Sequence, residues 1–207
     1  MYGPPAPRRR RRSKKLAEIV AEEAERNPGV IIEAFATDEH RIGLKPITRR
    51  VWAPRGSRPV APCHHRFEWL YVTAFVSPAT GESFWYLGTG VDKGLFEETL
   101  ALFAREAGAG SDRVIVLVLD GAGWHTAPGL KVPEGIRLVY LPPYTPELQP
   151  AETLWIHVDE PIFNRHFDTL SELDATVAAQ CIALHANRER IKAQSGFHWW
   201  PGRVQPN

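Results

Sequence analysis

A run of aliphatic residues that ends in a carboxylate constrains this chain more than any other feature. From Val114 to Leu119 every residue is Val, Ile or Leu, and the next residue is Asp120. A short, wholly apolar run predicts a strand buried on both faces, as in a parallel sheet covered by helices. Burying an unpaired carboxylate costs several kcal/mol, so the end of this strand must open onto water, a cation or a partner.

The other elements of the chain predict an α/β fold. Strand patterns occur on both sides of the aliphatic run, with turn residues between them. The expected strands are 29–46 with its end at Asp38 and Glu39, a short strand at 49–60 that a Pro/Gly turn breaks, two strands within 67–88, and 136–141. Residues at helical spacing predict helices at 16–26, 93–107, a short segment near Pro128, 150–159, and 169–191 with Thr169 or Ser171 as its N-cap.

This order favours a ribonuclease-H-like mixed sheet flanked by helices, in which three antiparallel strands precede parallel strands that alternate with helices. In such a sheet the first and fourth strands lie side by side, so Asp38 and Asp120 would meet although they are far apart in the sequence. Two neighbouring carboxylates repel each other unless a cation lies between them. Mg²⁺ takes oxygen ligands and keeps open positions for water and phosphate, so it suits such a pair.

A third acid follows the Pro-rich link 142–150. Pro150 fits the first position of a helix, which places Glu152 in the first turn, close behind a strand expected beside that of Asp120. An acid in a first turn also stabilises the helix dipole, by about 0.3–1 kcal/mol, without any chemical role. From the residues alone, Glu152 is either such an acid or a third metal ligand.

The charges of the chain are divided unevenly. Residues 1–15 hold seven cations and no acid, while the whole chain has a net charge of only +1, so the remainder is acidic. A run of like charge behind several prolines predicts a disordered tail that binds the DNA backbone, and a solubilising extension is the alternative. The cations of the tail are Arg8, Arg9, Arg10, Arg11, Arg12, Lys14 and Lys15.

A second group of cations surrounds an aromatic residue. Trp52 lies among Arg49, Arg50, Arg55 and Arg58, a combination that would follow a DNA backbone by charge and stacking. The alternative is a solvated hairpin with a core tryptophan.

Other classes of protein are disfavoured. No stretch approaches the roughly 20 apolar residues of a membrane span, and no apolar signal core follows the N-terminal arginines, so we expect a cytoplasmic protein without a membrane partner. Cys63 and Cys181 are too few for a disulfide framework. The adjacent residues 63–65 (CHH) would point to opposite faces of a strand, and no second pair of ligands exists for zinc.

Four motifs together resemble a known family. They are TDEHRIGLKP, RRVWAPRG, LVLDGAGWHT and LVYLPPYTPELQPAETLW, in that order. Over about residues 30–190 they resemble the catalytic domain of DDE transposases of the mariner superfamily, in its bacterial insertion-sequence branch. The resemblance implies a ribonuclease-H-like catalytic domain at 30–190, after a basic tail at 1–15 and a lead-in helix and linker at 16–29, and before a C-terminal tail at 191–207.

The resemblance also implies a function. Asp38, Asp120 and Glu152 would hold two Mg²⁺ or Mn²⁺ ions for DNA strand cleavage and strand transfer. The expected partners are transposon ends, target DNA and a second copy of the chain in the active complex. The expected place of action is the bacterial nucleoid. His125 stands where the family often carries a histidine, which would contact DNA or the outer shell of the metal, and a loop histidine without a role is the alternative.

Departures from the family leave other interpretations open. Gly121 and Gln149 stand where the family usually has Asn, and the helix-turn-helix segments that precede the family's catalytic domain are not seen before Asp38. A separately encoded portion would then recognise the DNA ends. A transposase remnant that only binds DNA or oligomerises is the main alternative. An alkaline-phosphatase-type phosphomutase, whose metal-binding start resembles residues 119–123 (LDGAG), is a second, but that family needs a much longer chain.

Overall fold

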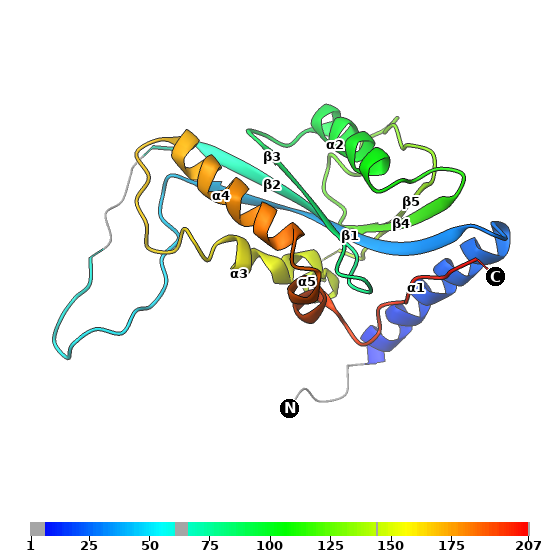
Figure 1. Cartoon of the computed structure of the whole chain (residues 1–207), viewed down its shortest axis with the longest axis horizontal. Coiled ribbons are helices and arrows are strands. Elements are labelled where there is room, and N and C mark those ends of the chain that lie inside the picture. Colours follow the sequence, from blue (N-terminus) through cyan, green and yellow to red (C-terminus); the bar gives the residue numbers. More distant parts are fainter. Residues whose placement is uncertain (1–6, 61–65, 144, 207) are drawn as a thin grey trace.

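A single mixed sheet forms the centre of the molecule (Figure 1). The computed structural model describes residues 7–60, 66–143 and 145–206. The strand order across the sheet is β3-β2-β1-β4-β5. The strands are β1 (Ile31–Gly43), β2 (Trp69–Val76), β3 (Ser83–Gly88), β4 (Arg113–Leu119) and β5 (Ile136–Tyr140).

The pairing of the strands confirms the predicted ribonuclease-H-like order. β1–β2 and β2–β3 are antiparallel, whereas β1–β4 and β4–β5 are parallel. The first and fourth strands are therefore neighbours, as the sequence indicates. β1 is longer than predicted and does not end at Asp38 and Glu39, because its second half continues against β2 as far as Gly43.

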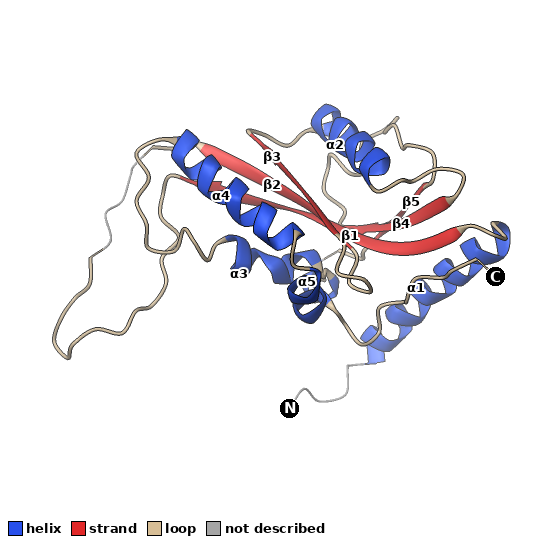
Figure 2. Cartoon of the chain, viewed as in Figure 1, coloured by secondary structure: helices blue, strands red, loops and turns tan. Residues whose placement is uncertain are grey.

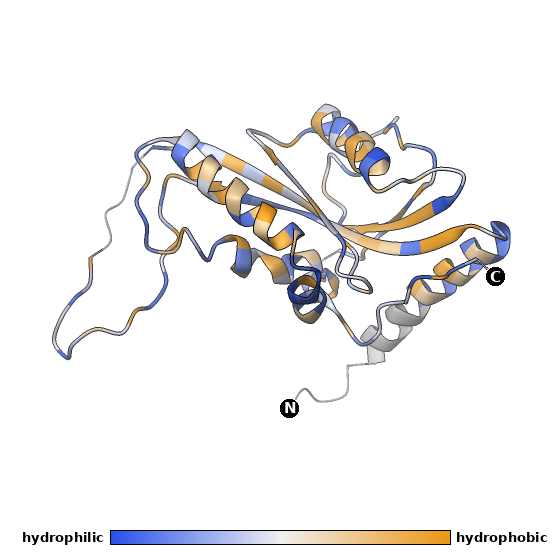
Figure 3. Cartoon of the chain, in the orientation of Figure 1, coloured by the Kyte–Doolittle hydropathy of each residue, from blue (hydrophilic) through white to orange (hydrophobic). Residues whose placement is uncertain are grey.

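Helices cover both faces of the sheet (Figure 2). Helix α2 (Lys93–Glu106) packs Phe96, Leu100 and Phe103 on one face, as its apolar spacing predicts. The other face carries α1 (Pro7–Arg26), the 3-10 segments η1 (Pro146–Leu148) and η2 (Ala151–Leu154), α3 (Trp155–Val158), α4 (Leu170–His185) and α5 (Arg188–Ser195). Figure 3 shows many hydrophobic residues along β1 and β4, two neighbouring interior strands that both layers bury.

Two predicted elements are absent, and two predicted helices are divided, the first of them (150–159) into η2 and α3. Residues 49–60 form no strand, because Pro54 and Pro59 lack amide donors and Gly56 has a positive φ of 88°. Instead, residues 44–60, called here the β1–β2 loop, extend away from the sheet (Figure 1). The segment near Pro128 contains turns rather than a helix. The last predicted helix starts after the Thr169 N-cap but breaks at residues 186–187 into α4 and α5.

Both ends of the described chain pack on the sheet. The first helix begins at Pro7, so the prediction of disorder is corrected for residues 7–15: proline suits a first helical position, and arginine and lysine are good helix formers. Leu16 and Val20 are buried in the core. Near the other end, Trp200 joins the same core, and Val204 forms a β-bridge with Ile32. In the part of the chain that the structure describes, no helix is long and apolar enough to cross a membrane.

Candidate active site

Strand register places Asp38 beside Asp120. The parallel pairing of β1 with β4 ends at the pair Ala36 and Val118. Asp38 and Asp120 each lie two residues farther along their strands, and the side chains of a strand alternate between faces. Because Ala36 and Val118 both face the core that contains α3 and α4, the two carboxylates emerge on that same side.

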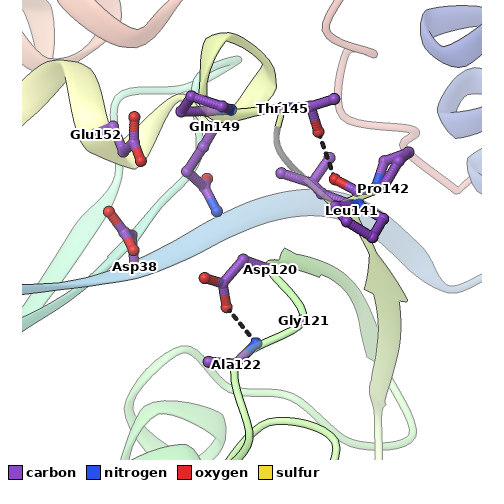
Figure 4. A pocket seen from close by; sticks show the side chains of 11 residues that line it. Asp38, Asp120, Gly121, Ala122, Leu141, Pro142, Thr145, Gln149 and Glu152 are labelled. Carbon is purple, nitrogen blue, oxygen red and sulfur yellow. Dashed lines mark hydrogen bonds between the residues drawn. The ribbon is translucent and has the colours of Figure 1, made fainter.

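A third carboxylate reaches them from the segment after the Pro-rich link. Segment η2 begins directly after Pro150, and Glu152 lies in its first turn, as the sequence predicts. Asp38, Asp120 and Glu152 line one pocket of about 400 Å³, called here the acidic pocket, and Figure 4 shows their side chains around the same space. Its other lining residues are Gly121, Ala122, Leu141, Pro142, Pro143, Thr145, Pro146 and Gln149.

The surroundings of Asp38 make its carboxylate hard to ionise. Burial, followed by the negative charges of Glu39 and Glu152, raises its pKa to about 7. The indole N–H of Trp155 donates to Oδ2 of Asp38 at 2.9 Å and opposes this rise. For Glu152, burial and then the charges of Asp120 and Glu147 raise the pKa as well. Negative charge is therefore crowded in the acidic pocket.

Asp120 differs because a histidine lies behind it. His125 Nδ1 lies 2.7 Å from Oδ1 of Asp120, and this hydrogen bond is the main reason that the pKa of Asp120 is lowered. His125 Nε2 lies 3.1 Å from Oε1 of Glu39. Burial of the ring opposes its positive charge, but the two carboxylates outweigh burial and raise the pKa of His125 to about 9. The imidazolium then donates to both acids.

The same contacts favour one of the two roles predicted for His125. Its ring is fully buried, so it does not offer a surface for DNA, and it lies behind Asp120, where a histidine of the outer shell of a metal site would lie. The indole N–H of Trp124 lies 3.0 Å from Nε2 and can donate to it only when the ring is neutral, so this contact competes with the bond to Glu39.

The acidic pocket has the donor chemistry of a divalent-metal site. Its three acids offer only oxygen ligands, which suit Mg²⁺ or Mn²⁺. The raised pKa values of Asp38 and Glu152 show uncompensated negative charge that a cation would offset. Among the described residues, no group of three His, Cys, Asp or Glu side chains already lies close enough to hold one ion. The three acids would have to draw closer as an ion binds.

The two departures from the family pattern both lie in the acidic pocket. Gly121 has open space where a Cβ would project. Gln149 is buried, and its Nε2 donates to the carbonyl oxygen of Thr37 at 2.8 Å (Figure 4 shows the side chain reaching toward β1). Neither residue displaces a carboxylate from the pocket.

The predicted DNA-contacting residues lie elsewhere. Trp52, Arg49, Arg50 and Arg55 are exposed in the β1–β2 loop, so Trp52 is not the core tryptophan of the alternative interpretation. Lys15 is exposed on α1. The side chains of residues 8–12 and 14 are not among those that the structure describes. Residues 61–65 are not described either, so the prediction that residues 63–65 (CHH) bind no zinc stays a prediction. Cys181 is free and buried.

Sequence reasoning missed the residues that support Asp38. Trp155 lies three positions after Glu152 in the motif PAETLW, and His40 lies two positions after Asp38, on the same face of β1. The rings of His40 and Trp155 stack with centroids 5.0 Å apart. The spacing was visible in the sequence, but the contact between β1 and α3 follows from the tertiary fold alone.

Comparisons with known proteins agree with this geometry. The DDE superfamily endonuclease family matches residues 34–174, a range that contains all three acids. The uncharacterized protein y4pE/y4sA of Sinorhizobium fredii (strain NBRC 101917 / NGR234) is 37% identical over 106 residues, which are 51% of this chain and 77% of the relative.

Two solved structures share the fold. The Mos1 transposase paired-end complex with left transposon end matches with a TM-score of 0.53 and 14% identity. The Mos1 mariner paired end complex with Mn matches with a TM-score of 0.52 and 16% identity. Each match covers 95% of this chain and 65% of the Mos1 chain, so the chain spans just under two thirds of the length of these proteins. On the family match over residues 34–174, the chain belongs to the DDE superfamily of endonucleases.

Proposed function

We propose that this chain is the catalytic domain of a transposase that cuts and joins DNA strands with divalent metal ions. The observation that carries the proposal is the convergence of Asp38, Asp120 and Glu152, from three separate elements, on one acidic pocket. Membership of the DDE superfamily and the fold shared with Mos1 structures support it.

The three acids would hold two Mg²⁺ or Mn²⁺ ions. A bound pair of ions supplies Lewis acidity, which activates an attacking water or 3′-hydroxyl and stabilises the leaving oxygen. None of the described residues that line the acidic pocket is Lys, Arg or His, so a DNA phosphate would meet only repulsion there without cations. The role of the protein side chains is then to hold the metal and to orient the phosphate, while His125 fixes Asp120 from behind.

DNA would be held outside the acidic pocket. We assign the DNA backbone to the cations of α1, which are Arg8, Arg9, Arg10, Arg11, Arg12, Lys14 and Lys15, and to Arg49, Arg50, Arg55 and Trp52 of the β1–β2 loop. The paired-end complex of Mos1 with its left transposon end supports transposon ends as the substrate, and we propose a homodimer as the active form. A separately encoded helix-turn-helix portion would recognise those ends, and the reaction would take place at the nucleoid in the bacterial cytoplasm.

Nicking of supercoiled plasmid by the 207-residue chain tests the proposal. We expect nicking with Mg²⁺ or Mn²⁺, none with EDTA, and none by Asp120→Asn, which keeps the shape of the side chain but removes its charge. Asp112→Asn, an exposed residue just before β4, is the matched control and should nick like the wild type. Nicking that survives EDTA, or equal nicking by Asp120→Asn, would refute the assignment. DNA binding without nicking in either metal would favour a remnant that only binds DNA.

A further inference from the structure

Trp155 joins two of the three carboxylate-bearing elements. It is the first residue of α3, directly after the η2 segment that carries Glu152, and its indole N–H donates to Oδ2 of Asp38 on β1 at 2.9 Å. The torsion that turns an aspartate carboxylate has broad, weak preferences, so a carboxylate at the wall of an open pocket needs a partner to fix its orientation. This indole is such a partner.

The indole is itself held in place by a second layer of contacts. Its ring stacks on His40, with ring planes only 15° apart, and meets the ring of Trp85 nearly edge-on. His40 Nε2 in turn lies 2.9 Å from Oδ1 of Asp159, a buried residue at the end of α3. A continuous series of contacts therefore runs from Asp159 through His40 and Trp155 to Asp38.

The position of these residues gives the contacts a purpose. Asp38 and His40 lie on the same face of β1, and Trp155 and Asp159 lie on the α3 side. Two hydrogen bonds and one ring stack therefore tie β1 to the α3 side within a few residues of Asp38 and, for Trp155, of Glu152. A neutral N–H donor can fix the orientation of a carboxylate without competing for its charge, unlike an arginine or lysine.

We propose that Trp155 is a positioning residue that fixes the Asp38 carboxylate relative to Glu152 for divalent-metal binding. This inference rests on the proposed function. Partners of this kind behind a metal ligand typically contribute 10–100-fold to metal affinity or activity. The N–H of Trp155 contacts the Asp38 carboxylate and would act on the reaction only through the metal. Removing this N–H should therefore weaken metal binding more than it lowers the rate at saturating metal.

The substitution Trp155→Phe tests the role, because it retains a ring for the stack but removes the N–H. The matched control is Trp85→Phe, since Trp85 belongs to the same aromatic cluster but donates to Ser83 Oγ at 3.0 Å instead of to a pocket acid. Calorimetric titration of Mn²⁺ into the metal-free full chain should show a Kd raised about tenfold or more by Trp155→Phe and changed less than about twofold by Trp85→Phe.

Plasmid nicking gives a second readout. The Mn²⁺ concentration for half-maximal nicking should rise about tenfold in Trp155→Phe, while the rate at saturating Mn²⁺ stays within about threefold of the wild type. A loss of rate that saturating metal does not restore, or an equal change in both variants, would overturn the positioning role.

The hydrogen bond can be tested without metal or activity. In the metal-free protein, the NMR signal of the indole N–H that disappears in Trp155→Phe should shift in Asp38→Ala and stay in place in Asp112→Asn. An unmoved signal in Asp38→Ala would overturn the contact. A wild-type chain that binds no Mn²⁺ would refute the proposed function and the role with it, whereas normal Mn²⁺ binding by Trp155→Phe would refute the role alone.

Discussion

Two of the carboxylates on strand β1, Glu33 and Asp38, have opposite surroundings. Glu33 is fully buried, yet it accepts hydrogen bonds from Arg113 at 2.6 Å and from Arg203 at 2.6 Å. Asp38 is partly buried, has a neutral indole as its side-chain donor, and faces the charges of Glu39 and Glu152. One carboxylate has cations in the fold, and the other does not.

The pKa directions follow from these neighbours. Burial alone would raise the pKa of Glu33, but hydrogen bonds from Ser77 and the two arginines outweigh it, and the pKa is lowered. Burial and repulsion instead raise the pKa of Asp38 to about 7. A buried carboxylate that the fold neutralises contributes to structure, while one that the fold leaves without a cation marks a place where a cation from outside can bind.

The largest effect should come from breaking the neutralised cluster. Glu33→Gln removes the charge that Arg113 and Arg203 face, and loss of one partner of a buried pair costs about 3–5 kcal/mol. We expect a loss of about 3 kcal/mol, near the lower end of that range, because Glu82 still lies 2.7 Å from Arg113. Urea unfolding measures it. The control is Glu22→Gln, which breaks an exposed pair with Arg26 and should cost less than about 1 kcal/mol.

The same variant has a pH signature. Because the pKa of Glu33 is lowered in the folded protein, its contribution to stability is present above the ordinary value of 4.5 and is lost as the pH falls through the lowered folded value. The difference in unfolding free energy between wild type and Glu33→Gln should therefore narrow as the pH falls below 4.5. A constant difference across that window would show that the ionisation of Glu33 does not matter.

The same loss of charge at Asp38 should have the opposite consequence, a loss of activity without a loss of stability. Asp38→Asn keeps an acceptor for the Trp155 N–H but removes a proposed metal ligand. Nicking should therefore fall by at least about 100-fold, a larger loss than that expected when only a partner behind a ligand is removed. The metal-free protein should unfold at the same or a slightly higher urea concentration, because one repelling charge is gone. Glu33→Gln should nick like the wild type when it is assayed without urea at a temperature at which the variant is folded. If Asp38→Asn destabilises the fold as much as Glu33→Gln, the contrast between the two acids is wrong.

The sequence predicted the acids of the site better than their support. The aliphatic run before Asp120 and the proline before Glu152 are local patterns. The first placed Asp120 just after a strand, and the second placed Glu152 in the first turn of a helical segment. The register of β1 against β4 follows from fold topology, so the ribonuclease-H-like order was enough to bring Asp38 to Asp120. In contrast, the hydrogen bonds from Trp155 to Asp38 and from His125 to Glu39 join segments more than 80 residues apart, and no periodicity encodes them.

The errors also have a physical cause. In the β1–β2 loop, the sequence suggested a short strand at 49–60 broken by a Pro/Gly turn, but the prolines and a positive-φ glycine prevent pairing over the whole segment. For residues 7–15, like charge suggested disorder, while helix propensity and the docking of Leu16 and Val20 on the sheet favoured continuation of α1. In both places a local rule gave way to another property of the same residues.

The smallest expected effect concerns charge that the fold leaves in solvent. The base of the β1–β2 loop is held by Asn164, whose side chain accepts from the Arg49 N–H at 2.8 Å and donates to the Arg49 carbonyl at 3.0 Å, so the neighbouring Arg50 projects from a fixed point. Arg50→Gln should lower the slope of log affinity against log salt by about 0.9 for one phosphate contact on duplex DNA. Stability should change by less than about 0.5 kcal/mol, because Arg50 is exposed. Fluorescence anisotropy at several salt concentrations measures the slope, with Lys192→Gln on α5 as a charge-matched control that should leave it unchanged. Equal slopes for the two variants would show that Arg50 does not bind DNA, and would shift the assignment toward the cations of α1.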